Sequence, residues 1–264
     1  MRNNHEIDYR IFGEEMQYVE VELDPMETAI AEPGSFMMMD DGIQMDTMFG
    51  DGSGQQSSLM SKLFSAGKRL LVGENLFVTA YTNIGQGKKR VSFASPYPGK
   101  IIPLDLQKLG NKVICQKDAF LCAAKGVAIG IEFQKRLGTG LFGGEGFIME
   151  KLEGDGLAFV HAGGHVLRRE LGSGEILKID TGCIVAFTAG VHYDIQFVGG
   201  IKNTLFGGEG VFYATLRGPG NVWIQTLPIS RLAGRILAYG STSHRKEEGS
   251  ILGGLGNLLD GDRF

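Results

Sequence analysis

The chain contains few of the residues and motifs that usually indicate a particular chemical function. It has 3 cysteines in 264 residues, no CxxC pair, 7 prolines and 1 tryptophan. An odd cysteine count without a CxxC pair argues against a disulfide framework or a zinc ribbon, and favours buried thiols in a reducing cytoplasm. No run of 18 apolar residues occurs, so the sequence predicts no membrane span. The polar start, MRNNHEIDYRIFGEE, predicts no signal peptide.

Positive charge is also in short supply. Lysine and arginine number 26 against 30 acidic residues, which gives a net charge of −4. Proteins that bind nucleic acids usually carry a basic surplus, because neutralising phosphates supplies most of their affinity. This balance argues against a nucleic-acid partner. The hydrophobic share of 43% and the charged share of 21% are typical of a soluble globular protein.

Glycine is abundant instead, with 41 residues. Glycine adopts positive φ without strain and therefore occurs in tight turns. Alternating segments such as YVEVEL, HYDIQFV and NVWIQTL lie between the glycines. This period of two, with a turn signal every few residues, predicts an all-β fold.

One hexapeptide, LFGGEG, occurs at residues 141–146 and again at 205–210. A degenerate third copy lies in RLLVGENLFVTAYTNIGQG at 69–87, and the three glutamates fall in register. We interpret the motif as a structural turn in which a carboxylate accepts backbone N–H groups. A catalytic carboxylate would need a partner, and none is evident. The motif residues are Gly73, Glu74, Gly144, Glu145, Gly208 and Glu209.

A second landmark, an alternating run that ends in aspartate, occurs as VELD (21–24), IPLD (102–105) and LKID (177–180). Repetition at two landmarks predicts three tandem antiparallel β-units around a pseudo-threefold axis. The expected boundaries are 1–98 for the first unit, 99–172 for the second and 173–240 for the third. Residues 241–264 are expected to form a flexible tail.

The first unit carries an insertion at residues 50–71. Leucines and an alanine at helical spacing predict a short basic amphipathic helix at 57–71. This helix either covers a sheet edge or docks on a membrane surface or a partner. The tail at 241–264 ends in an apolar and glycine-rich stretch, GSILGGLGNLLDGDRF. Three alternatives stay open for it: it docks on a neighbouring subunit, it contacts a membrane, or it is disordered.

Three histidines are the strongest candidates for a metal site. His161 and His165 flank a Gly-Gly pair, and His192 is a third candidate ligand. No downstream carboxylate completes a cupin-like set, so the sequence predicts no cofactor and no metal. The segment GTGLFG (138–143) matches GxGxxG, but a β-type run follows it where a nucleotide-binding loop requires a helix.

Several spaced motifs together resemble a known family. They are AEPGSFMMMD (31–40), LFSAGKRLLVGENLFVTAYTN (63–83), LKIDTGCIVAF (177–187) and the repeated FGGEG. They are similar to bacterial relatives of the mitochondrial factor called altered inheritance of mitochondria protein 24. The resemblance implies tandem units with a fold like the tryptophan RNA-binding attenuation protein subunit, with double-stranded β-helix character. It also implies a non-catalytic assembly role, as the mitochondrial relative is linked to inner-membrane organisation.

We therefore expect a cytoplasmic, non-enzymatic scaffold or binding protein. It is expected to form a homo-oligomer, to bind an unknown protein partner and to contact membranes peripherally. Two alternatives stay open at this point. One is a cupin-like metalloenzyme that uses the three histidines, and the other is an RNA-binding ring.

Overall fold

The structure is a computed structural model that describes residues 4–49, 77–135, 147–198 and 211–244. The chain divides into two compact units, residues 1–228 and residues 229–264. The β-rich unit and the C-terminal unit are described separately below.

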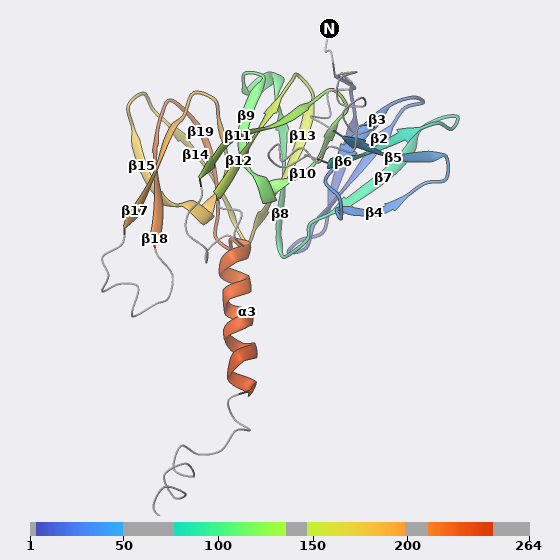
Figure 1. The fold of residues 1–264 in the computed structure, drawn as a ribbon. Helices are drawn as coiled ribbons and strands as arrows, with labels where there is room; N and C mark the ends of the chain where they lie inside the picture. Colours follow the sequence, from blue (N-terminus) through green and yellow to red (C-terminus); the bar gives the residue numbers. More distant parts are fainter. Residues whose placement is uncertain (1–3, 50–76, 136–146, 199–210, 245–264) are drawn as a thin grey trace, which may run out of the picture. The chain divides into compact units, whose positions relative to one another are not determined.

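The all-β prediction is confirmed, since the described part of residues 1–228 consists of strands with three short 3-10 turns (Figure 1). The turns are η1 (Gln107–Leu109), η2 (Lys117–Ala119) and η3 (Thr181–Cys183). The strands are β1 (Asp8–Phe12), β2 (Tyr18–Leu23), β3 (Thr28–Ala31), β4 (Phe36–Met39), β5 (Ile43–Phe49), β6 (Phe77–Asn83), β7 (Lys89–Ala94), β8 (Gly99–Asp105), β9 (Lys112–Gln116), β10 (Phe120–Ala124), β11 (Ala128–Lys135), β12 (Phe147–Glu153), β13 (Leu157–Gly163), β14 (Val166–Leu171), β15 (Ile176–Asp180), β16 (Ile184–Thr188), β17 (His192–Val198), β18 (Val211–Arg217) and β19 (Gly220–Gln225).

The same pattern of strand pairing occurs three times along the chain. In β2–β7, in β8–β13 and in β14–β19, the sixth strand lies between the first and the third, and the fifth lies between the second and the fourth. The third strand of each set carries a bulge at the same place against the sixth, between Phe36 and Met38 in the first set. The chain is therefore built from three copies of a six-stranded unit, with β1 added at the edge of the first.

Successive units are joined by a further antiparallel pairing. The third strand of one unit pairs with the second strand of the unit before it, as β10 with β3 and β16 with β9. Half of one unit and half of the next thus form one continuous sheet. The four sheets are sheet 1 (β1-β2-β7-β4), sheet 2 (β5-β6-β3-β10-β13-β8), sheet 3 (β11-β12-β9-β16-β19-β14) and sheet 4 (β15-β18-β17).

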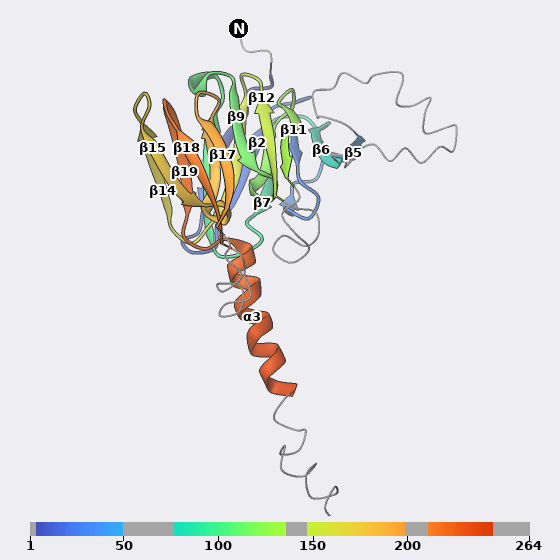
Figure 2. The same cartoon turned by 60° about the vertical axis from the view of Figure 1, so that its left-hand side comes forward.

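Three hydrophobic clusters hold these sheets in a row (Figures 1 and 2). Val19, Phe93 and Phe159 belong to the cluster between sheets 1 and 2. The second cluster joins sheets 2 and 3, and the third joins sheets 3 and 4. Sheets 2 and 3 are consequently apolar on both faces, and sheets 1 and 4 lie at opposite ends of the row.

This layering explains two kinds of strand sequence. In β2, which lies in an end sheet, YVEVEL alternates between buried and half-buried residues, as its period of two predicts. In β10 and β16, the runs FLCAA and IVAFT are buried throughout, because core covers both faces. The equivalent strand of the first unit, β4, is exposed throughout.

The aspartate landmark does not mark equivalent strands. Asp24 follows β2 and Asp105 ends β8, which are first strands of their units, whereas Asp180 ends β15, a second strand. Alternation reads alike in either strand, so the pattern could not tell them apart. The same shift affects the expected boundary at 172/173, which separates β14 from its partner β19.

The pseudo-threefold arrangement is not confirmed. A closed arrangement would need β4 to pair with β15, but among the described strands these two end separate sheets. Figure 1 places them at opposite ends of the row of sheets. The helix expected at 57–71 and the tail after residue 244 lie outside the described residues.

The C-terminal unit contains a helix that the sequence reading assigned to the third β-unit and the tail. Helix α3 (Ile229–His244) follows Pro228 directly. Ile229, Leu232, Ala233 and Ile236 recur at helical spacing, which is the signal that was missed.

Candidate functional site

The six motif residues of the Gly-Glu turns, Gly73, Glu74, Gly144, Glu145, Gly208 and Glu209, lie outside the described residues. The strands that follow them do confirm the register. Thr79, Glu150 and Ala214 each lie five residues after a motif glutamate, and each occupies the same position in the fifth strand of its unit. The structural reading of the glutamates themselves stays a prediction.

His161 is a buried histidine on β13, only 1% exposed. Its ring meets the ring of Tyr97 edge-on, with 4.3 Å between centroids, and its Nε2 lies 3.1 Å from the Tyr97 carbonyl oxygen. A carbonyl can only accept, so Nε2 carries the proton and Nδ1 is left as an acceptor with no partner in the described structure. Burial lowers the pKa of His161 to about 4, which keeps the ring neutral at pH 7.

The other two histidines lie at the surface. A tight turn carries His165 outward: a Cβ at Gly163 would lie 3.0 Å from the carbonyl carbon of Leu227, so only glycine fits there. His192 is exposed at the start of β17, opposite Arg217. Within the described ranges, no group of three histidine, cysteine or acidic side chains could hold a metal ion. The structure therefore does not bring the three candidate ligands together.

A second group of ionisable side chains surrounds Tyr97 and was not found from the sequence. Burial, followed by the nearby Asp118 carboxylate, raises the pKa of Glu32 to about 7. Burial, with Asp118 and Glu32 nearby, raises the pKa of Tyr97 to about 12. Glu32 follows β3 and Asp118 lies in η2, so the junction of the first two units unites them. At pH 7 Tyr97 is protonated and His161 is neutral, while Glu32 is near its pKa and populates both protonation states.

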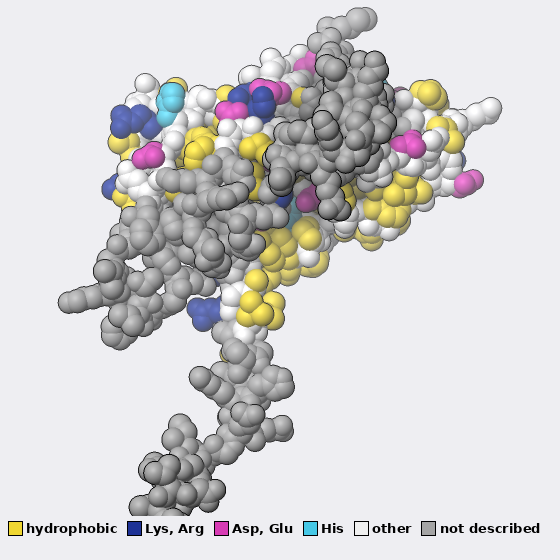
Figure 3. Space-filling view, in the orientation of Figure 1, with side chains coloured by type: hydrophobic (Ala, Val, Ile, Leu, Met, Phe, Trp, Pro, Cys, Tyr) yellow, Lys and Arg dark blue, Asp and Glu magenta, His cyan; other side chains and the backbone are white. Residues whose placement is uncertain are grey.

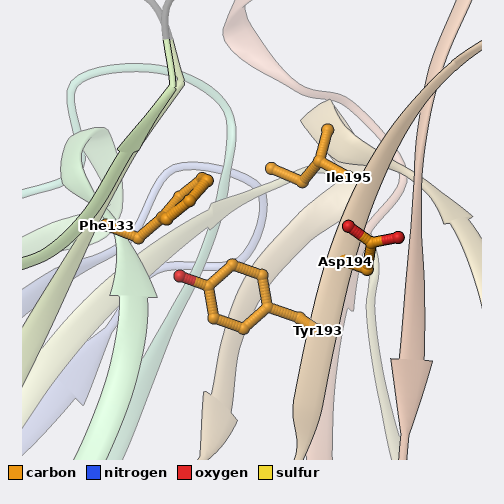
Figure 4. A pocket seen from close by; sticks show the side chains of 4 residues that line it. All are labelled: Phe133, Tyr193, Asp194 and Ile195. Atoms are coloured by element: carbon orange, nitrogen blue, oxygen red, sulfur yellow. The ribbon is translucent and has the colours of Figure 1, made fainter.

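A cleft of about 440 Å³ lies between β11 and β17 (Figure 4). Phe133, Tyr193, Asp194 and Ile195 line it, and the side chains of Tyr193 and Ile195 extend toward Phe133. The rings of Phe133 and Tyr193 meet edge-on, with centroids 5.3 Å apart. Burial, together with the Glu132 carboxylate, raises the pKa of Tyr193 to about 12. Two aromatic rings and an isoleucine make up most of its lining, so this cleft suits a small apolar group.

The most unusual surface is the edge strand β4. Its four residues, Phe36, Met37, Met38 and Met39, are 38%, 48%, 44% and 39% exposed. Figure 3 shows hydrophobic side chains gathered over this end of the β-rich unit. Sheet 1 also carries charged pairs on its other strands, with Arg90 of β7 3.2 Å from Glu22 of β2. Methionine side chains are flexible and polarisable, and they are frequent on surfaces that bind other proteins.

Comparison with known proteins agrees with this architecture. The family model described as "Mitochondrial biogenesis AIM24" matches residues 9–227. The chain belongs to the mitochondrial biogenesis AIM24 family. An uncharacterised protein of Streptococcus pyogenes serotype M6 is 31% identical over 229 residues, which are 85% of this chain and 87% of the relative.

The fold has also been seen in a crystal. A solved structure of a Streptococcus pyogenes protein superposes with a TM-score of 0.67 at 23% identity, and the match covers 88% of this chain and 99% of that one. At this identity the likeness concerns the fold alone. The resemblance read from the sequence motifs is thereby confirmed at the level of the family. The likeness to the tryptophan RNA-binding attenuation protein stays a prediction.

Proposed function

We propose that this AIM24-family chain is a non-enzymatic scaffold that binds other protein surfaces through β4. The observation that carries the proposal is the run of four exposed apolar residues on an edge strand. Isolated edge strands usually carry charges or proline to prevent pairing, and Phe36–Met39 carry neither. Such a strand is suited to a partner that covers it.

A differential binding experiment tests the proposal. Met38→Lys places a charge on β4, and Met16→Lys, at a position 53% exposed between β1 and β2, is the matched control. Each variant is purified from the protein's own cell after mild cross-linking, and the attached proteins are quantified. We expect Met38→Lys to lose proteins that the wild type and Met16→Lys retain. If both variants retain the same proteins at the same levels, β4 is not the binding surface.

The metalloenzyme alternative has less support, because the three histidines lie apart in the fold. Metal analysis of protein purified without an affinity tag discriminates between the two functions. Metal well below one equivalent per chain is expected for the scaffold. A stoichiometric transition metal would favour the enzyme. The RNA-binding alternative rests only on the predicted fold likeness, and the net charge of −4 argues against it.

The membrane-peripheral part of the role is supported by α3. Within the described ranges, no helix is long and apolar enough to cross a membrane. The sequence of α3 has no acidic residue, and Arg231 and Arg235 flank the apolar stripe of Ile229, Leu232 and Ile236 by helical spacing. Ile236 is 63% exposed. A basic amphipathic helix with an exposed apolar face is suited to the surface of an anionic bilayer.

Vesicle flotation tests this contact. The full chain is expected to float with vesicles that contain phosphatidylserine, and a chain that ends at Pro228 is expected to stay in solution. Ile236→Asp should abolish flotation, because it places a charge in the apolar face. Ser230→Asp adds the same charge at the start of the helix, where acidic residues are favourable, and should float like the wild type. Equal flotation of all four proteins would refute a role for α3.

A further inference from the structure

The antiparallel pairing that joins successive units leaves two edge strands open among the described strands, one at each end of the row of sheets. Within the chain, a third strand pairs with the second strand of the preceding unit at two junctions. The first unit has its own third strand, β4, and the third unit has its own second strand, β15. Neither of these strands has a second partner among the described strands.

We propose that β4 of one chain pairs antiparallel with β15 of a second copy of the chain, head to tail. This inference rests on the proposed function, since it names the partner that covers β4. Such a contact would join sheet 1 of one copy to sheet 4 of the other. The product has the strand order of sheets 2 and 3, which the chain already builds twice.

The repeat fixes the register of the contact. At the first junction Cys122, Ala123 and Ala124 lie opposite Ala31, Ile30 and Ala29, and at the second Ala186, Phe187 and Thr188 lie opposite Cys115, Ile114 and Val113. In the third strands, Met38 is structurally equivalent to Cys122 and Ala186, because each is the first residue after the bulge that all three strands share.

In the second strands, Ile179 is structurally equivalent to Ala31 and Cys115, because each pairs with the same position of the fifth strand of its unit. The same rule places Met38, Met39 and Asp40 opposite Ile179, Lys178 and Leu177.

The directions in which the backbone N–H groups point agree with this register. The Asp40 N–H donates to the Arg90 carbonyl oxygen on β7 at 2.9 Å, and N–H groups alternate along a strand. The Met39 N–H therefore points away from β7, toward the open edge. At the first junction the Glu32 N–H donates to Leu121 across the units, so the N–H of Ile30, two residues earlier, faces the same way. Lys178 is the equivalent of Ile30 and presents its N–H at the open edge of β15.

The side chains also suit a covered edge. At the two internal junctions the paired residues are at most 8% exposed. Their counterparts Met38 and Met39 are 44% and 39% exposed, and Asp40 is exposed as well. On β15, Lys178 is exposed, and Leu177 and Ile179 are half-buried. The one charged side chain in the three proposed β15 positions, that of Lys178, lies 5.4 Å from the Tyr213 ring centroid on the neighbouring strand. Its ammonium therefore need not block a strand that approaches the edge.

A head-to-tail contact is heterologous, because the two copies contribute different surfaces. Successive additions close into a ring or continue as a filament. Proline at the outward N–H position removes one edge donor and is tolerated on edge strands. Met39→Pro and Lys178→Pro therefore each block one end of the chain and leave the other end intact.

Sedimentation velocity on the full chain tests the pairing. The wild type is expected to form assemblies whose masses are multiples of 28.6 kDa. Each proline variant alone should associate about thirtyfold more weakly, because edge hydrogen bonds are lost. An equimolar mixture should form a capped dimer of twice 28.6 kDa, because each variant still offers the edge that the other lacks. Recovery on mixing also shows that both variants are folded.

Three outcomes would overturn the inference. A wild type that stays monomeric at every concentration excludes the contact and leaves the scaffold proposal to its own binding test. A Lys178→Pro chain that assembles like the wild type would show that β15 takes no part. A mixture that stays monomeric while the wild type assembles would show that the copies do not meet at β4 and β15.

Discussion

Gln225 is the residue whose loss should reveal how the second and third units are held together. It ends β19 and is 5% exposed. Its Oε1 accepts the N–H of Gly163, and its Nε2 donates to the carbonyl of Gly182, both at 2.8 Å. One side chain thus ties the end of β13 to η3. Gln225→Met keeps the length of the side chain and removes both hydrogen bonds.

The cost follows from the two backbone groups left behind. A buried polar group that loses its partner costs about 1–3 kcal/mol, so two such groups should lower the free energy of unfolding by about 3 kcal/mol. This is a change of roughly a hundredfold in the unfolding equilibrium. Urea unfolding followed by tryptophan fluorescence measures it. The same substitution at exposed Gln44, whose bond to Asp46 is 3.0 Å, is the control and should change the free energy by less than about 0.5 kcal/mol. Equal stability of both variants would refute the bridging role.

Three further predictions concern the ionisable groups. Because the folded-state pKa of Glu32 is raised to about 7 from 4.5, its contribution to stability is present below pH 4.5 and is lost as pH rises through 7. As pH rises from 4.5 to above 7, the free energy of unfolding of Glu32→Gln should therefore increase relative to that of the wild type, by an amount on the order of 2 kcal/mol. A difference between the urea unfolding midpoints of the two proteins that stays constant with pH would contradict this. The pKa of His161 is lowered to about 4 from 6.5, so stability from its neutral form is lost as pH falls from 6.5 through 4, and an NMR titration midpoint near 6.5 would disprove the assignment. Burial raises the pKa of Cys115 and Cys122 well above the usual thiol value, so a thiol reagent should label only Cys183 in the native protein and all three cysteines in urea.

The sequence carried enough information to predict the β-class and the repetition. The Gly-Glu motif is followed each time by the fifth strand of a unit, so aligning the motif aligned β6, β12 and β18. Alternation in YVEVEL predicted the one-sided burial of β2. The aspartate landmark failed because an alternating run that ends in aspartate can belong to either of two strands. The pairing of a strand of one unit with a strand of the unit before it, as β10 with β3, could not be predicted either. It depends on which sheet edges lie next to each other in the folded chain, and the local sequence pattern does not encode this.

The candidate site was predicted less well than the fold. His161 is one of three weak candidate metal ligands in the sequence, and the pairing of β13 with β8 and β10 buries it. Glu32 and Asp118 are distant in sequence, and neither has a local pattern that predicts a raised pKa. The exposure of β4 could not be read from FMMM, because the equivalent apolar run in β10, FLCAA, is completely buried. The difference is positional, as β10 has a unit before it to pair with and β4 does not.

Amide hydrogen exchange on β4 and β15 is the most direct test of the repeated edge. At high protein concentration the Met39 and Lys178 amides of the wild type should exchange as slowly as those of Ala123 and Phe187 at the internal junctions. In a dilute, monomeric sample both amides should exchange rapidly while the internal junctions stay protected. Rapid exchange at β4 and β15 at every concentration would contradict the account, because it would show that the two edges remain open in the assembled protein.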